Sequence, residues 1–155
     1  SVIAVDGEAY LFTAKSGTGK STHTKLWRKY FGNRAVMVND DKPLLKVTGK
    51  GVLACGTPWA GKDHLQNNIM VPLKAVCILE RDTVNHIEQI RKRDAWKMIL
   101  QQSYRSDQPA VLSSTIRLAE QIMDKTKLYR LGCNMSMQAV ETSYNGMNTD
   151  IDYAD

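Results

Sequence analysis

The sequence predicts a single α/β domain in which helices pack against a β-sheet. Short apolar runs of strand length alternate along the chain with longer segments whose apolar residues recur at the spacing of a helix face. The 155 residues suit one compact domain rather than two. Apolar residues make up 43% and charged residues 24%, which is ordinary globular usage and excludes an intrinsically disordered, collagen-like or channel-forming chain.

A β-hairpin followed by a helix is expected at the start of the chain. Residues 2–5 and 10–14 are two short apolar runs, and the Asp6-Gly7 dipeptide between them favours a tight turn. A glycine-rich loop comes next. From 20 to 31 the apolar residues fall at helical spacing, which predicts a helix with one buried face that ends at the following glycine.

The middle of the chain is predicted to be rich in strands. Residues 35–38 form a short apolar run, and the runs at 44–47 and 52–55 bracket a glycine-containing turn. Residues 56–68 are polar, with two glycines and one proline, and predict a loop. The continuous apolar run at 75–79 is typical of a central, fully buried strand.

Two helices are predicted further along, between a weaker strand at 86–90 and a last strand at 129–133. The apolar residues of the first helix lie at 95–100. Those of the second lie at 112–123, and a proline stands near its start. Both helices are expected to pack on the sheet.

The end of the folded domain is expected near residue 144. Residues 136–144 predict a short helix, and the residues after it are polar and acidic. The sequence therefore predicts one domain over residues 1–144 and a frayed tail over 145–155. It shows no internal repeat and no low-complexity segment.

Charge and cysteine content narrow the classes of partner. The chain has 21 Lys and Arg against 16 Asp and Glu, a formal net charge of +5. These positive charges are scattered, so phosphate-bearing small molecules explain them as well as nucleic acid, and no aromatic-basic cluster supports a nucleic-acid partner. No apolar run approaches the roughly 20 residues of a membrane-spanning helix, so no membrane partner is expected.

Cysteines at 55, 77 and 133 lack Cys-x-x-Cys spacing, which predicts reduced thiols in a soluble, cytoplasmic protein.

The most informative stretch runs from Ala14 to Ser21. It fits the phosphate-binding pattern G-x-x-x-x-G-K-[ST], except that Ala14 replaces the first glycine. Because it follows a predicted strand and opens a predicted helix, its backbone N–H groups are expected to converge on a phosphate. Lys20 would reach the β- and γ-phosphates, and the Ser21 hydroxyl would hold Mg²⁺. The predicted nucleotide-binding residues are Ser16, Gly17, Thr18, Gly19, Lys20, Ser21 and Thr22.

The ligand implied by this loop is a nucleoside triphosphate with Mg²⁺. The alternative is a flexible Gly/Ser/Thr loop that only turns a strand into a helix, but such a loop rarely matches the pattern over this length in this setting. No Asn-Lys-x-Asp motif is present to read a guanine base, so ATP is the default nucleotide.

Asp40 and Asp41 follow an apolar run, where a P-loop protein needs a carboxylate near the metal ion. We expect Asp40 to face the Mg²⁺ shell and Asp41 to accept the proton of an attacking hydroxyl, and the reverse order is equally open. With Lys20 they form the candidate catalytic set. The alternative is an Asn-Asp-Asp turn whose side chains cap backbone groups.

A second loop, from Gly56 to Lys62, carries a proline, a tryptophan and a lysine between glycines. It is interpreted as an ordered active-site loop. Lys62 is a candidate for holding a transferred phosphate or an acidic substrate, and Thr57 for donating a hydrogen bond to the same group. His64 is a weak catalytic candidate beside them. The alternative is a surface loop pinned by Trp59.

These stretches together resemble one known family. Ser16 to Ser21, Asn39 to Lys42 and the strand-rich start look like the catalytic domain of the HPr kinase/phosphorylase family, which is distantly similar to the nucleotide domain of phosphoenolpyruvate carboxykinases. The likeness is strongest to short HPr kinase-like relatives associated with peptide-modification gene clusters, in the segments Thr22 to Trp27 and Gly56 to Lys62. The resemblance implies helices packed on a mixed sheet in a carboxykinase-like P-loop fold.

The resemblance also implies the reaction, which is transfer of a phosphoryl group to a serine hydroxyl. The leading hypothesis is therefore an ATP- and Mg²⁺-dependent serine kinase whose acceptor is a peptide or protein. The alternative is a nucleotide-binding regulatory or scaffold protein without catalysis. Assembly into a homo-oligomer is left open.

Overall fold

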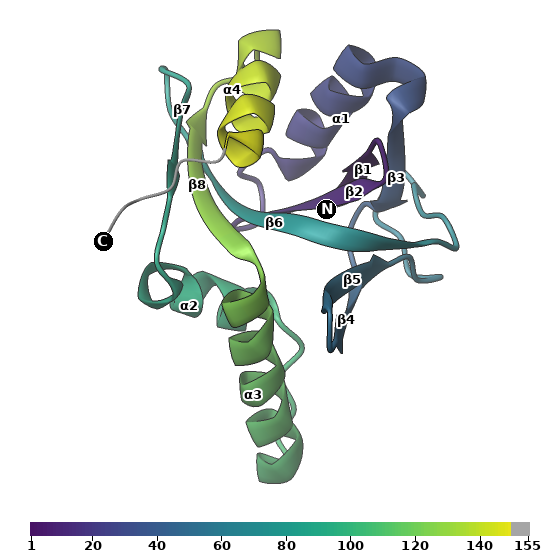
Figure 1. Ribbon diagram of the computed structural model, residues 1–155, viewed down its shortest axis with the longest axis vertical. Helices are drawn as coiled ribbons and strands as arrows, with labels where there is room; N and C mark the ends of the chain where they lie inside the picture. Colours follow the sequence, from purple (N-terminus) through teal and green to yellow (C-terminus); the bar gives the residue numbers. More distant parts are fainter. Residues whose placement is uncertain (150–155) are drawn as a thin grey trace.

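The computed structural model describes residues 1–149 and shows a mixed β-sheet with helices on both faces (Figure 1). The predicted α/β class is therefore correct at this coarse level. The strands are β1 (Val2–Val5), β2 (Glu8–Thr13), β3 (Ala35–Asn39), β4 (Leu44–Thr48), β5 (Gly51–Cys55), β6 (Met70–Arg81), β7 (His86–Gln89) and β8 (Lys127–Cys133). The helices are α1 (Lys20–Phe31), α2 (Lys92–Gln102), α3 (Pro109–Lys125) and α4 (Met137–Asn148), with a short 3-10 turn at Gly32–Arg34.

Two predicted boundaries differ from the structure. Strand β6 begins at Met70, well before the apolar run at 75–79, because its first residues pair with β5. Helix α4 continues past residue 144 to Asn148, and its last turn is held by Met147, which is only 2% exposed. Residues 145–148 therefore belong to the helix and not to a frayed tail. The rest of the predicted tail, 150–155, lies outside the described residues.

The strand order places several strand ends at one edge of the sheet. The order is β3-β1-β2-β6-β5-β4, and β8 pairs with β6 and with β7. Strand β1 is antiparallel to both β2 and β3, so β2 and β3 run in the same direction. Strands β2 and β8 are both parallel to β6. The carboxyl ends of β2, β3, β6 and β8 consequently point the same way.

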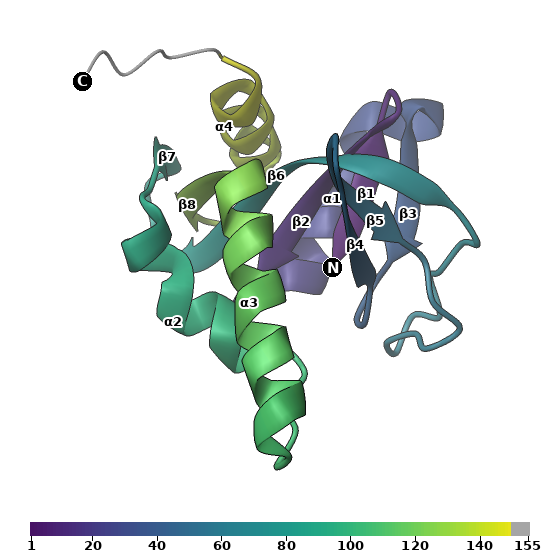
Figure 2. The same ribbon diagram turned by 60° about the horizontal axis from the view of Figure 1, so that its bottom comes forward.

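Each face of the sheet carries its own core. Helices α1 and α4 cover one face, and α2 and α3 lie against the other, as Figures 1 and 2 show from two directions. The first core contains Phe12, Trp27 and Leu131, and the second contains Val38, Ile78 and Met123. Strand β6 contributes to both because alternate residues of a strand point to opposite faces.

An aromatic cluster joins α1 and α4 to the sheet. Trp27 is fully buried, and its ring centroid lies 5.0 Å from that of Tyr10 and 5.8 Å from that of Tyr144. The indole N–H of Trp27 donates to His23 Nε2 at 3.0 Å and to Ser143 Oγ at 3.1 Å. Burial lowers the pKa of His23 to about 4, so this imidazole is neutral at pH 7 and serves the core.

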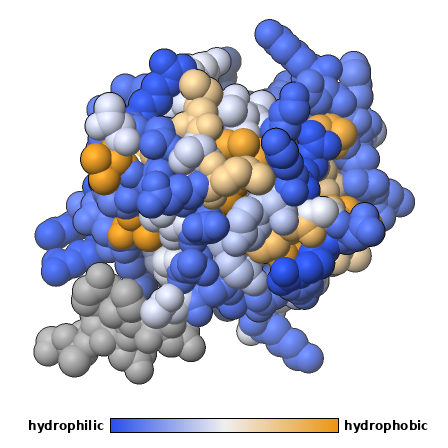
Figure 3. All heavy atoms as spheres, turned by 90° about the horizontal axis from the view of Figure 1, so that it is seen from above, coloured by the Kyte–Doolittle hydropathy of each residue, from blue (hydrophilic) through white to orange (hydrophobic). Residues whose placement is uncertain are grey.

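The outer surface is mainly hydrophilic where α1 and α4 form it. Figure 3 shows this face with small, separate apolar areas between larger hydrophilic ones. Among the described residues, none of the helices combines the length and the apolar character that crossing a bilayer demands.

Candidate functional site

Ser1 connects the two strand ends that carry the predicted chemistry. It pairs with Phe12 of β2, accepting the Phe12 N–H at 2.8 Å and donating its own amino group to the Phe12 carbonyl at 3.1 Å. Its hydroxyl donates to the Asp40 carbonyl at 2.7 Å. Because Ser1 lies between them, the glycine-rich loop after β2 and the aspartates after β3 occupy the same edge of the sheet.

The charges around the Ser1 amino group also indicate that the loop after β2 and the aspartates after β3 lie close together. The pKa of this amino group is lowered to about 5, mainly by burial and also by the Lys20 ammonium, while the carboxylates of Asp41 and Asp40 act to raise it. One buried nitrogen therefore experiences the charges of Lys20, Asp40 and Asp41 together. Neighbouring strands are about 4.8 Å apart, so β2 and β3, with β1 between them, are separated by about 10 Å.

The first loop has the backbone that its glycines allow. Gly17 has a φ of 79° and Gly19 a φ of 114°, in the left-handed region that residues with a side chain rarely adopt. Ala14 is fully buried at the end of β2 and does not take a positive φ. Alanine therefore fits at this position in place of the glycine of the general pattern.

The N-terminus of α1 is arranged to receive an anion. Gly19 is its N-cap and provides no side-chain hydrogen bond to the first turn, so the free N–H groups there have no capping side chain. The first turn holds no acidic residue, and the last turn holds Arg28 and Lys29. The helix dipole is thus left available to negative charge at the end next to the loop. Ser21 and Thr22 are exposed in this first turn.

Lys20 folds back across the first loop. Its ammonium donates to the Ala14 carbonyl at 2.9 Å, which places the charge over the start of the loop. Thr18 closes a turn inside the loop, since both its N–H and its hydroxyl donate to the Lys15 carbonyl, at 3.2 and 2.8 Å. Ser16 is exposed at the tip. These hydrogen bonds therefore fix the shape of the loop and hold the Lys20 ammonium against its first residue.

Arg81 is a site residue that the sequence did not reveal. It ends β6, the strand next to β2, and its guanidinium donates to the carbonyls of Gly17 and Thr18 at 2.5 and 3.3 Å. A trans peptide points its C=O and N–H in opposite directions. The Thr18 carbonyl and the Gly19 N–H belong to the same peptide unit. Because the carbonyl points toward Arg81, the Gly19 N–H points away from the guanidinium.

The two aspartates differ in their surroundings. Asp40 is half-buried, and one oxygen of its carboxylate accepts the Gly61 N–H at 2.7 Å. Asp41 is exposed, and within residues 1–149 no group hydrogen-bonds or pairs with its carboxylate; only its backbone N–H is engaged, by Asn39. Asp40 is therefore tied to the second loop, whereas the Asp41 carboxylate is free to meet a ligand.

Asn39 organises the second loop. Its fully buried amide donates to the Trp59 carbonyl at 2.9 Å and to Thr57 Oγ1 at 3.1 Å, while its Oδ1 accepts the N–H groups of Asp41 and Lys42 at 2.8 and 2.7 Å. The predicted capping turn is thus present, with Asn39 as its capping side chain, and the Asp40 carboxylate binds a backbone N–H of the second loop. This one side chain fixes the loop after β3 against the loop after β5.

Close packing also holds the second loop. A Cβ at Gly56 would lie 1.7 Å from the Asn67 carbonyl oxygen, and one at Gly61 would lie 3.0 Å from Asp40 Oδ2. Glycine is therefore required at position 56, where the neighbour is backbone, and at position 61 a larger residue would have to displace the Asp40 carboxylate. The ring of Trp59 is 66% exposed, so the loop is not pinned by this side chain as the alternative interpretation had it; Asn39 holds its carbonyl instead.

The three substrate candidates are not equivalent. The Thr57 hydroxyl donates to the Lys42 carbonyl at 2.7 Å, so its hydrogen is engaged within the protein. Lys62 and His64 are exposed, and His64 has a φ of 51° with its N–H donating to the Gly61 carbonyl. Lys62 thus extends from a loop that contacts Asp40, whereas Thr57 is a structural member of that loop.

Comparison with known proteins adds nothing to this geometry. No protein-family model, curated protein or solved structure matches the chain. The assignment of function below accordingly depends on the residues of this edge alone.

The donor set suits Mg²⁺ better than a transition metal. Ser21 and Asp40 offer hard oxygen ligands, and among residues 1–149 there is no group of three or more His, Cys, Asp or Glu side chains that would enclose a metal ion. Mg²⁺ is commonly held by one or two protein oxygens together with substrate phosphates and water. The residues present therefore fit Mg²⁺ bound with a nucleotide.

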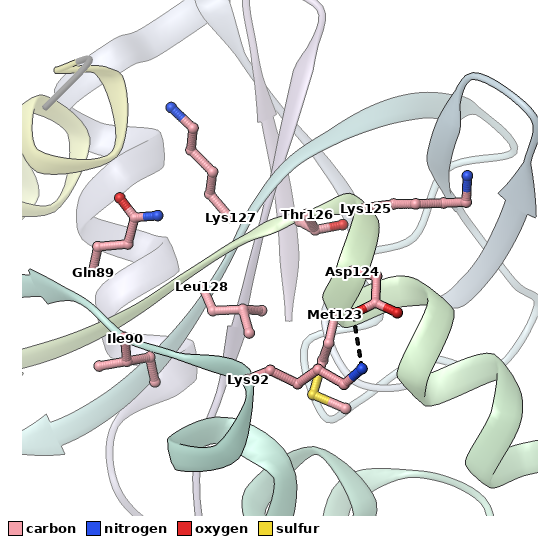
Figure 4. Close-up of a pocket in the computed structure, with 9 residues that line it drawn as sticks. All are labelled: Gln89, Ile90, Lys92, Met123, Asp124, Lys125, Thr126, Lys127 and Leu128. Atoms are coloured by element: carbon pink, nitrogen blue, oxygen red, sulfur yellow. Dashed lines mark hydrogen bonds and ion pairs between the residues drawn. The ribbon is translucent and has the colours of Figure 1, made fainter. Parts of the chain in front are cut away.

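A shallow hollow of about 300 Å³ lies at the other end of the strands, near the start of β8 (Figure 4). The Lys92 ammonium, one of three lysines that line it, is at 2.8 Å from Asp124 and 3.3 Å from Glu120 and is therefore already paired. Since β2 and β8 are both parallel to β6, the amino end of β8 is remote from the loop after β2. The hollow is separate from the candidate site.

Proposed function

We propose that the chain is an ATP- and Mg²⁺-dependent kinase that transfers a phosphoryl group to a serine hydroxyl of a peptide or protein. The observation that carries the proposal is the meeting of two strand ends at Ser1, with Lys20 on one side and the aspartates on the other. Ligands of open α/β sheets bind beyond the carboxyl ends of parallel strands, which is where this edge lies. The mixed sheet is compatible with a phosphoenolpyruvate carboxykinase-like P-loop fold and an HPr kinase-like enzyme.

The proposed step is an in-line displacement at the γ-phosphorus of ATP. The serine oxygen forms a bond to phosphorus, the bond from phosphorus to the β–γ bridging oxygen breaks, and ADP leaves with that electron pair. The hydroxyl proton passes to a carboxylate. Such a reaction needs positioning and charge stabilisation more than covalent chemistry from the protein.

Asp41 is the group proposed to accept the proton. Its carboxylate is exposed and engaged by no other group of the described residues, so both oxygens are open to the hydroxyl of an incoming substrate. Asp40 is less suited, because the Gly61 N–H already binds one of its oxygens. Its second oxygen remains for the Mg²⁺ shell, together with the Ser21 hydroxyl.

The first loop would bind the phosphates. The Gly19 N–H and the uncapped first turn of α1 offer donors to phosphate oxygens, and Lys20 adds a positive charge. Bound Mg²⁺ supplies neutralisation of the charge that develops on the phosphates. The three free cysteines are consistent with the reducing cytoplasm as the site of action.

Transfer of label from [γ-³²P]ATP to serine-containing peptides tests this function. The wild type is expected to label a peptide, and Asp41→Asn to lower the rate by at least about a hundredfold, because the amide accepts no proton. ATP affinity should stay the same. Asp107→Asn, which removes an exposed carboxylate between α2 and α3, is the matched control and should keep full activity.

Two results would overturn the proposal. Equal labelling by wild type and Asp41→Asn would remove Asp41 from the reaction. Tight ATP binding without transfer to any serine, threonine or small hydroxy compound would instead favour a nucleotide-binding regulatory protein.

A further inference from the structure

Strand β4 forms a free edge of the sheet beside the candidate site. The strand order ends at β4, which among the described residues pairs only with β5. Its outer backbone N–H and C=O groups are therefore available to another strand. Only Lys42 and Pro43 separate Asp41 from Leu44, the first residue of β4.

The segment around this edge carries one sign of charge. Residues 42–62 contain no Asp or Glu, and they contain lysines at positions 42, 46, 50 and 62. All four lysines are exposed. Lys46 lies within β4 itself, Lys42 just before it, and Lys50 in the turn to β5. The free edge is thus bordered by positive charge along its length.

One face of this part of the sheet carries exposed apolar residues beside Lys46. Leu44, Cys55 and Met70 are in register across β4, β5 and β6; Leu44 and Met70 are 58% and 64% exposed, and Cys55 between them is buried. Paired residues of neighbouring strands share a face. The opposite face, which includes Leu45 and Ala54, packs in the core with α3. An added strand would therefore meet Leu44 and, two residues further along β4, Lys46 on the same face.

We propose that β4 receives the phosphoryl acceptor as an additional strand, and that the acceptor is an extended segment with an apolar residue facing Leu44 and an acidic residue, two positions away, facing Lys46. This docking mode rests on the proposed function, since it brings the acceptor serine to Asp41. Backbone hydrogen bonds supply affinity in such strand addition, and side chains at alternate positions supply specificity. The lysines favour acidic residues in the added strand.

The same charge disfavours a second copy of this chain as the occupant. Pairing two β4 edges would bring Lys46 and its neighbours on one copy close to those on the other, and like charges facing each other across a sheet are destabilising. Exposed lysines on edge strands are a common protection against such pairing. The lysines at this edge therefore attract an acidic strand and repel the same lysines of a second copy.

The register of the added strand is set by the two positions of β4 that share a face. Leu44 and Lys46 are two residues apart. The apolar and acidic side chains that face them should therefore also be two residues apart, about 7 Å along the added strand. The acceptor serine lies beyond the end of β4 that follows Asp41, Lys42 and Pro43.

Binding of labelled peptides in the absence of nucleotide tests the docking apart from the reaction. Three 13-residue probes share one serine and, along one face of the strand, leucines that alternate with a variable residue. The variable residue is glutamate, glutamine or lysine, and the residues of the other face are the same in all three. Fluorescence anisotropy should show the glutamate probe binding at least about tenfold more tightly than the glutamine probe, and the lysine probe not binding. N-methylation of alternate backbone amides of the glutamate probe should abolish binding, because it removes the strand donors.

Charge reversal at β4 provides the decisive variant. Lys46→Glu should weaken the glutamate probe about tenfold and give the lysine probe measurable binding, a gain that misfolding does not produce. Lys97→Glu, on exposed α2, is the matched control and should leave both affinities unchanged. Equal losses in the two variants would mean attraction to net charge alone and would overturn the proposal, as would tight binding of the N-methylated probe.

The outcomes separate this inference from the proposed function. Binding of the glutamate probe that depends on Lys46, without phosphoryl transfer, supports the docking and contradicts the kinase. Phosphoryl transfer to all three probes at equal rates, unchanged in Lys46→Glu, supports the kinase and contradicts the docking. Dimerisation of the wild type that is lost in a β4 variant would show a second copy at this edge and would overturn the docking as well.

Discussion

The two glycine-containing loops of the sheet edge use their polar groups in opposite ways. In the first loop, the N–H groups at the start of α1 have no capping side chain, and Lys20 is held beside them by the Ala14 carbonyl. In the second loop, Thr57 and the Trp59 carbonyl are bound by Lys42 and Asn39 within the protein. Both loops contain lysine, threonine and glycine, so composition alone does not distinguish them. The difference is expected if the first loop binds the proposed nucleotide and the second holds Asp40 and Asp41 in place.

The largest expected effect comes from replacing Lys20 of the first loop with alanine, and the same replacement of Lys62 in the second loop provides the comparison. Lys20→Ala should lower phosphoryl transfer by at least about a thousandfold, because the charge next to the phosphates is lost. Lys62→Ala, with an exposed side chain, should change it less than about tenfold. Steady-state rates with one peptide acceptor give both values. A larger loss for Lys62→Ala than for Lys20→Ala would reverse the comparison.

Removing the amide that holds the second loop should mainly affect stability. Asn39→Ala leaves the backbone N–H groups of Asp41 and Lys42 without their partner and should lower the free energy of unfolding by about 4 kcal/mol. Thr57→Val loses one hydroxyl and should cost about 1 kcal/mol. Urea denaturation measures both. If Thr57→Val leaves stability unchanged but raises the KM for ATP, Thr57 binds phosphate and the description of the loop is wrong.

The predicted and observed elements agree where residues close together in the sequence determine the structure. The bounds of α1 follow from glycines at both ends and apolar residues at helical spacing, and the prediction is confirmed from Lys20 to Phe31. Strand β6 was predicted too short because Pro72 and Lys74 interrupt its apolar pattern, and only pairing with β5 and β2 explains them.

The polar residues that the sequence analysis missed have hydrogen-bond partners far away in the sequence. Arg81 contacts Gly17 across 64 positions, and nothing near Arg81 in the sequence indicates that contact. Asn39 was visible as part of an Asn-Asp-Asp turn, but its bonds to Thr57 and Trp59 depend on where β5 ends. The apolar patterns predicted the elements, whereas the partners of polar side chains required the tertiary fold.

The helix that begins at the first loop should also make stability depend on pH. His23 has a pKa of about 4 in the folded protein against an ordinary value of 6.5, so below pH 6.5 the unfolded chain binds more protons. Stability should fall as the pH drops from 6.5 to 4, by about 3 kcal/mol in total. Comparing urea denaturation of wild type and His23→Gln isolates this contribution, because glutamine keeps an acceptor for Trp27 and does not titrate. Identical pH slopes in the two proteins would contradict it.

The smallest predicted effect concerns the positioning of the first loop by Arg81. Arg81→Ala should raise the KM for ATP about fivefold while leaving kcat and the melting temperature nearly unchanged, because the guanidinium orients loop carbonyls on the protein surface. Arg81→Lys should restore little, since an ammonium lacks the two-pronged geometry. A fall in kcat with a constant KM would instead place Arg81 at the transferred phosphoryl group.

The most direct test of the account is calorimetric titration of ATP with and without Mg²⁺ into the wild type, Lys20→Ala and Asp40→Asn. A single nucleotide and metal site predicts that the wild type binds one ATP more tightly with Mg²⁺, that Lys20→Ala loses affinity in both conditions, and that Asp40→Asn loses only the gain from Mg²⁺. Equal ATP affinity in all three proteins, independent of Mg²⁺, would show that the loop and the aspartates do not form one site.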